Sequence, residues 1–181
     1  MSGGTDRRCR AVFFDRDGVV NRSPGAGYVL APDQFHLNDG IAEAVRFLNE
    51  RSVLAIVITS QKGVGKGLMS DDDLAAIHRR MESELAEKGA AFDAIYAYTG
   101  TPRCPHRAKP DPEMILTAAE RFSIDLRLSW MIGDADRDIA MGRAAGLAGT
   151  IRLRGEKPIA TPADHTLESP LEILDFLRRI L

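Results

Sequence analysis

Cysteine is scarce in this chain of 181 residues, and long hydrophobic runs are missing. Two cysteines, Cys9 and Cys104, are too few for a disulfide framework, so a reduced compartment is the default expectation. The longest apolar run covers the six residues 53–58, which is too short to cross a bilayer, and the first residues have no apolar stretch of signal-peptide length. We therefore expect a cytoplasmic protein without a membrane partner.

The chain also lacks an excess of charge of either sign, because 24 Lys and Arg residues oppose 26 Asp and Glu residues and leave a net charge of −2. This balance argues against broad contact with nucleic acid. A hydrophobic content of 44% is too high for a disordered chain. Since no repeat, low-complexity tract or linker is visible, we expect one monomeric domain over residues 1–181, with a flexible tail at residues 1–8.

Short apolar runs alternate with segments of helical period. Helices are expected around residues 41–48 and over 70–88 with Ser70 at the N-cap. Two more are expected to start with Asp111 and with Ser169 as N-caps, each followed by proline. The alternation predicts an α/β fold, a doubly wound and mainly parallel sheet with helices on both faces. The Gly-rich stretches 23–27 and 63–67 are expected to be loops, and the segments between strands are too short for a large cap domain. Strands are expected at residues 9–14, 53–58, 92–97, 128–132, 149–153 and 165–167.

Polar residues follow four of these strands, at the edge where such sheets bind ligands. Each set alone also suits an ordinary polar turn, although three acids within residues 134–138 favour a metal site over a solvated turn. Two carboxylates one residue apart in extended chain point the same way, and their repulsion requires a cation or a proton. Together the sets supply a carboxylate nucleophile, a second carboxyl, a phosphate clamp and a metal site, as phosphoryl transfer requires. They are Asp15 and Asp17, then Thr59, Ser60 and Gln61, then Lys109, and then Asp134 and Asp138.

These segments resemble, in order, the four motifs of the haloacid dehalogenase superfamily of phosphatases. The motifs are Asp15-x-Asp17-Gly18-Val19, Thr59, Lys109-Pro110 and Gly133-Asp134-x-x-x-Asp138. The resemblance spans residues 10–175 and implies the fold of that superfamily. It is closer to the branch of heptose-1,7-bisphosphate phosphatases and histidinol-phosphatases, on the basis of residues 14–21, 27–29 and 59–67.

The resemblance implies that Asp15 is the nucleophile and forms an aspartyl-phosphate. It implies that Asp17 protonates the leaving alcohol and then activates the water that releases phosphate. Mg²⁺ would be bound by the Asp15 carboxylate, the backbone carbonyl of Asp17 and Asp134. Asp138 would support the metal directly, through water or through Lys109.

The same resemblance assigns the contacts to substrate. Thr59 and Ser60 would hold the phosphoryl oxygens while Lys109 neutralises their charge. Gln61 and Asn21 are placed with these residues in the phosphate and substrate site.

Two departures from the branch change what we expect. The branch carries a zinc loop with a Cys-x-His pair followed by a Cys-x-Cys pair, but only Cys104-x-His106 is present here, and structural zinc needs four ligands. We therefore expect no structural zinc. In addition, Ala108 stands where the branch has Arg and Ala135 where Lys is common, so two cationic contacts to substrate are missing.

We therefore expect a Mg²⁺-dependent phosphatase acting on a small phosphorylated metabolite, a sugar phosphate such as a heptose bisphosphate. Histidinol phosphate is one alternative substrate. A polynucleotide 3′-phosphatase is another reading, which the net charge argues against. A non-enzymatic phosphoacceptor receiver domain is a third, but its phosphorylated Asp follows the third strand, where this chain has none.

Overall fold

The computed structural model describes residues 9–155 and 157–181, so the tail expected at residues 1–8 lies outside the described residues. In the described part, six parallel strands form one sheet in the order β3-β2-β1-β4-β5-β6. This is the doubly wound sheet that the sequence predicts. The strands are β1 (Ala11–Phe14), β2 (Leu54–Ser60), β3 (Ala94–Tyr98), β4 (Trp130–Gly133), β5 (Gly149–Leu153) and β6 (His165–Leu167).

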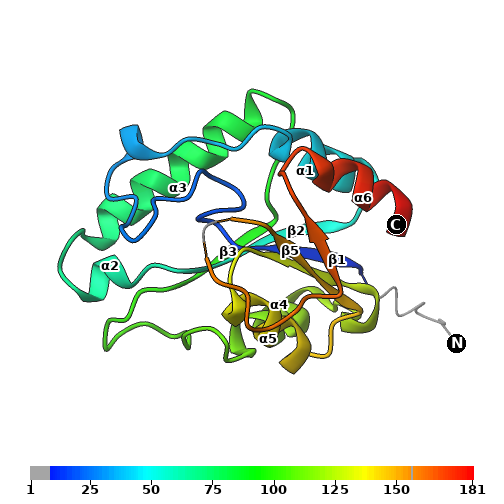
Figure 1. Cartoon of the computed structure of the whole chain (residues 1–181). Coiled ribbons are helices and arrows are strands. Elements are labelled where there is room, and N and C mark those ends of the chain that lie inside the picture. The colour runs from blue at the N-terminus through cyan, green and yellow to red at the C-terminus, as the bar shows by residue number, and fades with distance from the viewer. Residues whose placement is uncertain (1–8, 156) are drawn as a thin grey trace, which may run out of the picture.

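Helices cover both faces of the sheet (Figure 1): α1, α3 and α6 lie on one face, and α4 and α5 on the other. Strand β1 shows why both faces need a cover. Val12 and Phe14 pack into the core under the first group, whereas Ala11 and Phe13 pack into the core under the second. The helices are α1 (Ile41–Glu50), α2 (Lys62–Gly65), α3 (Asp71–Ala86), α4 (Glu113–Phe122), α5 (Asp136–Ala144) and α6 (Glu172–Ile180), with 3₁₀ turns at Pro32–Gln34 and Leu126–Leu128.

Most expected elements are present within two residues of their predicted bounds, and the last two strands coincide with the prediction. The start of α3 also agrees. The Ser70 hydroxyl accepts a hydrogen bond from the Asp73 N–H at 3.1 Å, and the Asp73 carboxylate accepts from the Ser70 N–H at 2.8 Å. This reciprocal pair is the capping box that the sequence indicates.

Three local predictions are wrong. Residues 62–65 of the second Gly-rich stretch form the short helix α2 rather than a loop. Helix α4 has Pro112 rather than Asp111 at its N-cap, and α6 begins at Glu172, three residues after Ser169. The Asp111 and Ser169 side chains accept hydrogen bonds from the N–H two residues further on, so each forms a local turn ahead of its helix.

The connections after β1 and β2 contain only short elements. Residues 15–53 hold the 3₁₀ turn Pro32–Gln34 and α1, and residues 61–93 hold α2 and α3. These are the two places where larger relatives were expected to carry a cap domain, so the carboxyl edge of the sheet is bordered by loops. None of the helices in the described residues is long and apolar enough to cross a membrane.

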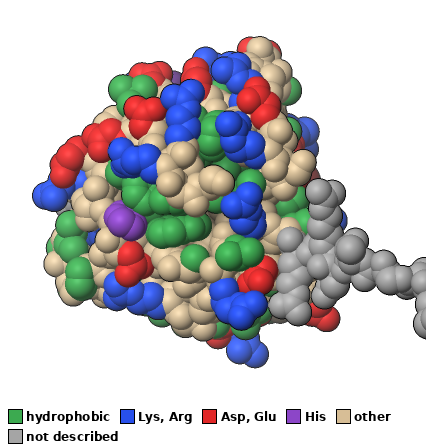
Figure 2. Space-filling model, turned by 90° about the vertical axis from the view of Figure 1, so that its right-hand side faces the viewer, with side chains coloured by type: hydrophobic (Ala, Val, Ile, Leu, Met, Phe, Trp, Pro, Cys, Tyr) green, Lys and Arg blue, Asp and Glu red, His purple; other side chains and the backbone are tan. Residues whose placement is uncertain are grey.

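The face that Figure 2 shows lies beside the C-terminus, away from α2. Basic and acidic side chains alternate on it around a few exposed hydrophobic ones. This mixture agrees with the near-neutral composition. Because acidic side chains are interspersed with the basic ones, this face does not favour contact with a nucleic-acid backbone.

Candidate active site

The sheet topology brings the predicted residues together. Strand β1 lies between β2 and β4, and the strand order reverses at β1 and β4. Ligands of doubly wound sheets bind outside the carboxyl ends of the strands at such a switch point. The ladder continues one residue past β1, because the Asp15 N–H donates to the Ile132 carbonyl at 2.9 Å. Asp15 therefore sits at the end of the central strand, beside the residues that follow β4.

Three buried carboxylates meet at this point. Oxygen atoms of Asp15, Asp134 and Asp138 all lie within 4.8 Å of one another. Oδ1 of Asp15 accepts from the Arg16 N–H at 2.7 Å and pairs with the Lys109 ammonium at 2.8 Å. Oδ2 of Asp15 is buried and has no hydrogen-bond partner in the described residues. A buried carboxylate oxygen without a partner needs an explanation, and a divalent cation among these oxygens supplies one.

Lys109 holds two of the carboxylates. Its Nζ lies 2.8 Å from Asp15 and 2.7 Å from Asp138, and its side chain is fully buried. Burial by itself lowers the pKa of Lys109, but Asp138 and Asp15 outweigh it and raise the pKa above its ordinary value, so the ammonium stays charged.

The pKa values of Asp15 and Asp138 shift in opposite directions. Burial raises the pKa of Asp15, but the charge and hydrogen bond of Lys109, together with the charges of Arg137 and Lys157, outweigh burial and hold that pKa below its usual value, so Asp15 is ionised. The pKa of Asp138 is raised by burial and by the charge of Asp15. The second oxygen of Asp138 accepts from the Ala135 N–H at 3.0 Å, which fixes the carboxylate at the start of α5.

Asp134 is the third carboxylate of the cluster. Burial and the neighbouring charge of Asp15 raise its pKa to about 6. The Lys157 ammonium lies 2.7 and 2.6 Å from its two oxygens. Gly18 allows the carboxylate to approach, because a Cβ at this glycine would overlap Asp134 Oδ2 and its φ of +94° is unfavourable for other residues.

Asp17 faces a different set of partners. Its carboxylate lies outside the three-carboxylate group and accepts from the Arg16 guanidinium at 2.9–3.1 Å. It also accepts from Asn21 Nδ2 at 3.0 Å and Gln61 Nε2 at 2.8 Å. The carboxylates of Asp15 and Asp17 thus do not converge on one cation, as extended chain would have them do. The buried Arg16 guanidinium supplies the charge compensation for Asp17.

The remaining predicted residues surround Asp17. Gln61 Nε2 also donates to Thr59 Oγ1 at 2.8 Å, and Asn21 is fully buried. Ser60 Oγ is buried without a hydrogen-bond partner. Six buried side-chain polar atoms lack a partner in the described residues, and four of them belong to Asp15, Asn21, Ser60 and Gln61. Their concentration on predicted site residues points to a ligand that supplies the missing partners.

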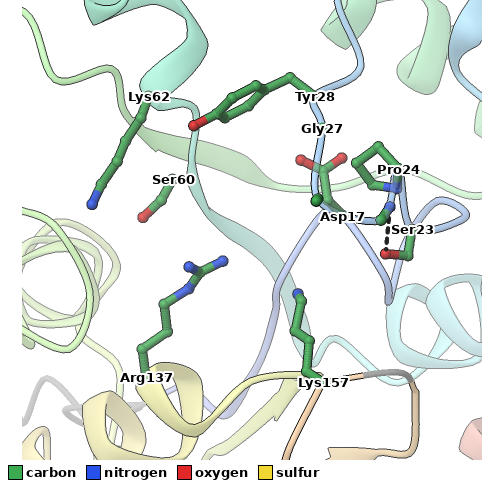
Figure 3. Close-up of a pocket in the computed structure, with 11 residues that line it drawn as sticks. Asp17, Ser23, Pro24, Gly27, Tyr28, Ser60, Lys62, Arg137 and Lys157 are labelled. Carbon is green, nitrogen blue, oxygen red and sulfur yellow. Dashed lines mark hydrogen bonds between the residues drawn. The ribbon is translucent and has the colours of Figure 1, made fainter.

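A basic pocket of about 190 Å³ opens beside Asp17 (Figure 3). Lys62 lines it from α2, Arg137 from the first turn of α5 and Lys157 from the loop after β5, and the Arg137 and Lys157 side chains point into it. Tyr28 closes another side. None of these three cations is among the predicted site residues. Arg137 lies inside the Gly133–Asp138 motif, whereas Lys157 has no motif and is marked only by its place after a strand.

Sequence reasoning also missed the support behind Asp17. Arg16 is fully buried, and its Nη1 lies 3.4 Å from His78 Nε2 on α3. Burial and the adjacent guanidinium lower the pKa of His78 to about 4, so its ring is neutral and accepts from Arg16. The signal that marks Arg16 is its place between two acids after a buried strand.

The remnant of the zinc loop has other partners. Cys104 Sγ accepts from the Thr99 N–H at 3.3 Å, and His106 Nδ1 lies 3.2 Å from a Glu113 oxygen. The absence of structural zinc stays a prediction.

Comparisons with known proteins identify the family of this chain. The family model for haloacid dehalogenase-like hydrolases matches residues 20–146. A D-glycero-beta-D-manno-heptose-1,7-bisphosphate 7-phosphatase of Rhodopseudomonas palustris is 38% identical over 165 residues, which is 86% of this chain and 89% of that protein. The D-glycero-alpha-D-manno-heptose-1,7-bisphosphate 7-phosphatase of Burkholderia mallei is 35% identical over 181 residues and covers 93% of both chains.

The solved structures agree with the sequences. The D,D-heptose 1.7-bisphosphate phosphatase from B. bronchiseptica, complexed with magnesium and phosphate, superposes with a TM-score of 0.80 at 27% identity and covers 95% of this chain and 99% of its own. The resemblance seen in the motifs is confirmed, and the receiver-domain alternative is excluded. The chain belongs to the haloacid dehalogenase-like hydrolase family and is a phosphoric monoester hydrolase.

Proposed function

We propose that the protein is a Mg²⁺-dependent phosphatase that hydrolyses a sugar bisphosphate of the heptose-1,7-bisphosphate type through an aspartyl-phosphate. The observation that carries the proposal is the unpartnered Oδ2 of Asp15, buried among three carboxylates close to a basic pocket. The printed activity of the relatives supports the choice of substrate.

The carboxylate group fits a divalent cation. Two of its three acids, Asp15 and Asp138, share the buried Lys109 ammonium, the third pairs with the partly exposed Lys157, and Mg²⁺ prefers such oxygen ligands. Asp15 and Asp134, with the backbone carbonyl of Asp17, would hold the ion. Asp138 would support it directly, through water or through Lys109. When bound, the cation would neutralise charge on the phosphoryl oxygens and favour attack at phosphorus.

Asp15 begins the proposed reaction. One oxygen of its carboxylate attacks the phosphorus atom of the ester, and the bond between phosphorus and the alcohol oxygen breaks. Asp17 gives the departing oxygen a proton. Lys109, Thr59 and Ser60 stabilise the negative charge on the transferred group.

Asp17 then works in reverse. It removes a proton from a water molecule whose oxygen attacks the phosphorus, so the bond to Asp15 breaks and inorganic phosphate leaves. Arg16, Asn21 and Gln61 hold the Asp17 carboxyl group in place for both steps.

The basic pocket supports a substrate with a second phosphate. Two cationic residues of the branch are replaced by Ala108 and Ala135 in this chain. Lys62 and Arg137 line the pocket from other positions. A second phosphate contacts these cations favourably. Histidinol phosphate would instead bring an ammonium group into the pocket, so this pocket disfavours it.

The test is a panel of phosphate esters assayed with Mg²⁺ and with EDTA. It includes heptose 1,7-bisphosphate, heptose 7-phosphate, histidinol phosphate and a 3′-phosphorylated oligonucleotide. We expect kcat/KM for the bisphosphate to exceed that for the monophosphate by about tenfold or more, since one charge-assisted hydrogen bond contributes about 1.5–3 kcal/mol.

Two variants separate chemistry from folding. Asp15→Asn removes the nucleophile in an almost identical shape and is expected to abolish hydrolysis. Asp136→Asn changes a neighbouring carboxylate that binds Arg152 and is expected to keep the Mg²⁺ requirement. Full activity of Asp15→Asn, or undiminished activity in EDTA, would contradict the proposal.

A further inference from the structure

We infer that Lys157 exchanges between two partners. In the metal-free enzyme its ammonium binds the Asp134 carboxylate, and once a divalent cation takes that carboxylate the ammonium donates to a phosphate oxygen in the basic pocket. The inference rests on the proposed function and assigns a role to a residue that lies outside the four motifs.

The first argument is the occupancy of Asp134. Lys157 Nζ lies 2.7 Å from Oδ1 and 2.6 Å from Oδ2, so one ammonium engages both oxygens. A cation that coordinates Asp134 needs at least one of these oxygens at a shorter distance than this. The ammonium and the cation therefore compete for the same atoms, and Lys157 has to move when the cation binds.

The second argument is charge. Asp134 lies in a group with Asp15 and Asp138, and Lys109 already pairs with those two. Without a metal ion, Lys157 is the cation that compensates Asp134. With a metal ion in the group, the ammonium and the ion repel each other, so the same side chain is driven toward an anionic ligand.

The third argument is that the backbone beside Lys157 is fixed. The Arg152 guanidinium, which is almost fully buried, donates to the Pro158 carbonyl at 3.1 Å and to Asp136 at 2.8 Å. Asp136 also accepts from the Thr161 N–H at 3.1 Å. These contacts hold Pro158 and Thr161, which follow Lys157, so the ammonium can move by rotation of the Lys157 side chain.

The fourth argument is that the side chain has somewhere to go. It is 31% exposed and lines two adjoining cavities, one beside Gly18 and Asp134 and the other the basic pocket. Figure 3 shows it pointing into the basic pocket between Arg137 and Asp17. Rotation about its methylene groups is enough to move the ammonium from one cavity to the other.

The experiment measures binding rather than turnover. Isothermal titration calorimetry gives the dissociation constant of Mg²⁺ alone, and then that of inorganic phosphate at saturating Mg²⁺. We compare the wild type, Lys157→Met and Lys157→Gln, after circular dichroism has shown that each is folded. We expect both variants to bind Mg²⁺ about fivefold more tightly and phosphate about fivefold more weakly, as loss of one partly exposed ion pair implies.

Arg137→Met is the matched control. Arg137 faces the same pocket, but no hydrogen bond joins it to Asp134 in the described residues. We expect it to weaken phosphate binding and to leave the Mg²⁺ dissociation constant within about twofold of the wild-type value, because the Arg137 charge acts on Asp15 and Asp138 through space and does not occupy the Asp134 oxygens. The same gain in Mg²⁺ affinity in this control would show a general charge effect and overturn the inference.

Three other results would contradict the exchange or the proposed function. Unchanged or weaker Mg²⁺ binding in Lys157→Met would refute competition, and unchanged phosphate binding would refute the exchange. A wild-type protein that binds no Mg²⁺ would instead contradict the proposed function, whatever the variants do.

Discussion

The replacement Asp134→Asn is expected to stabilise the metal-free protein while it removes a metal ligand. The carboxylate is buried beside Asp15, and these surroundings raise its pKa from 3.8 to about 6. Between these two pH values the folded protein keeps a proton that the unfolded chain has lost. Stability therefore falls as the pH rises through this window and stays low above it.

The magnitude follows from the pKa difference. One pKa unit corresponds to about 1.4 kcal/mol, so an ionised Asp134 lowers the free energy of unfolding by about 3 kcal/mol at pH 8. At pH 5 the folded group is mostly protonated, and the same relation gives about 1.5 kcal/mol. Asn has nearly the same shape and no charge, so it avoids this cost. The Lys157 ammonium that it releases is partly exposed to water.

Urea unfolding in EDTA at pH 5 and pH 8 measures the effect. We expect Asp134→Asn to raise the free energy of unfolding at both pH values, with the larger gain at pH 8. Asp136→Asn is the control, because hydrogen bonds from Arg152 and from backbone N–H groups lower the pKa of Asp136, and its loss should destabilise the fold. A destabilised Asp134→Asn at pH 8, or an equal gain at both pH values, would refute the reasoning.

Three further predictions concern the same cluster. Lys109→Met leaves Asp15 and Asp138 buried without their cation and should lower the free energy of unfolding at pH 8 by about 3–5 kcal/mol, so a loss below about 1 kcal/mol in urea would count against the assigned pairing. Gly18→Ala places a Cβ on Asp134 at a φ of +94°, and calorimetry should find Mg²⁺ binding at least about tenfold weaker. Mg²⁺ at about 100 times its dissociation constant should raise the midpoint of thermal unfolding at pH 8 by roughly 5–10 °C. The rise should be smaller at pH 5, where Asp134 is mostly protonated, and an equal rise would contradict its place among the ligands.

The fold could be predicted from sequence because its signals are local and repeated. Apolar runs such as residues 53–58 mark strands covered on both faces, and the Ser70 box marks a helix start. The errors lie where a side chain has two local choices. Asp111 and Ser169 accept from an N–H two residues on, and nothing in the sequence separates this turn from an N-cap.

For the candidate site, the sequence predicts which residues gather but not how their side chains are oriented. Residues that follow strands could be assembled from topology, because the carboxyl ends of parallel strands meet at one edge. The direction of each side chain could not be predicted, since it depends on partners distant in sequence. Asp17 turns toward Gln61 and the Arg16 guanidinium, which in turn meets His78 from α3. Lys157 contacts Asp134, which lies 23 positions earlier in the sequence, and Lys157 belongs to none of the four motifs.

The most direct test of the central claim is to trap the phosphorylated residue. The enzyme is quenched during turnover of heptose 1,7-bisphosphate with Mg²⁺ and treated with borohydride, which converts a phosphorylated aspartate to homoserine. Peptide mass spectrometry then locates the change. The account predicts homoserine at Asp15 only when substrate and Mg²⁺ are both present. Homoserine at a different aspartate, or none during active hydrolysis, would contradict it.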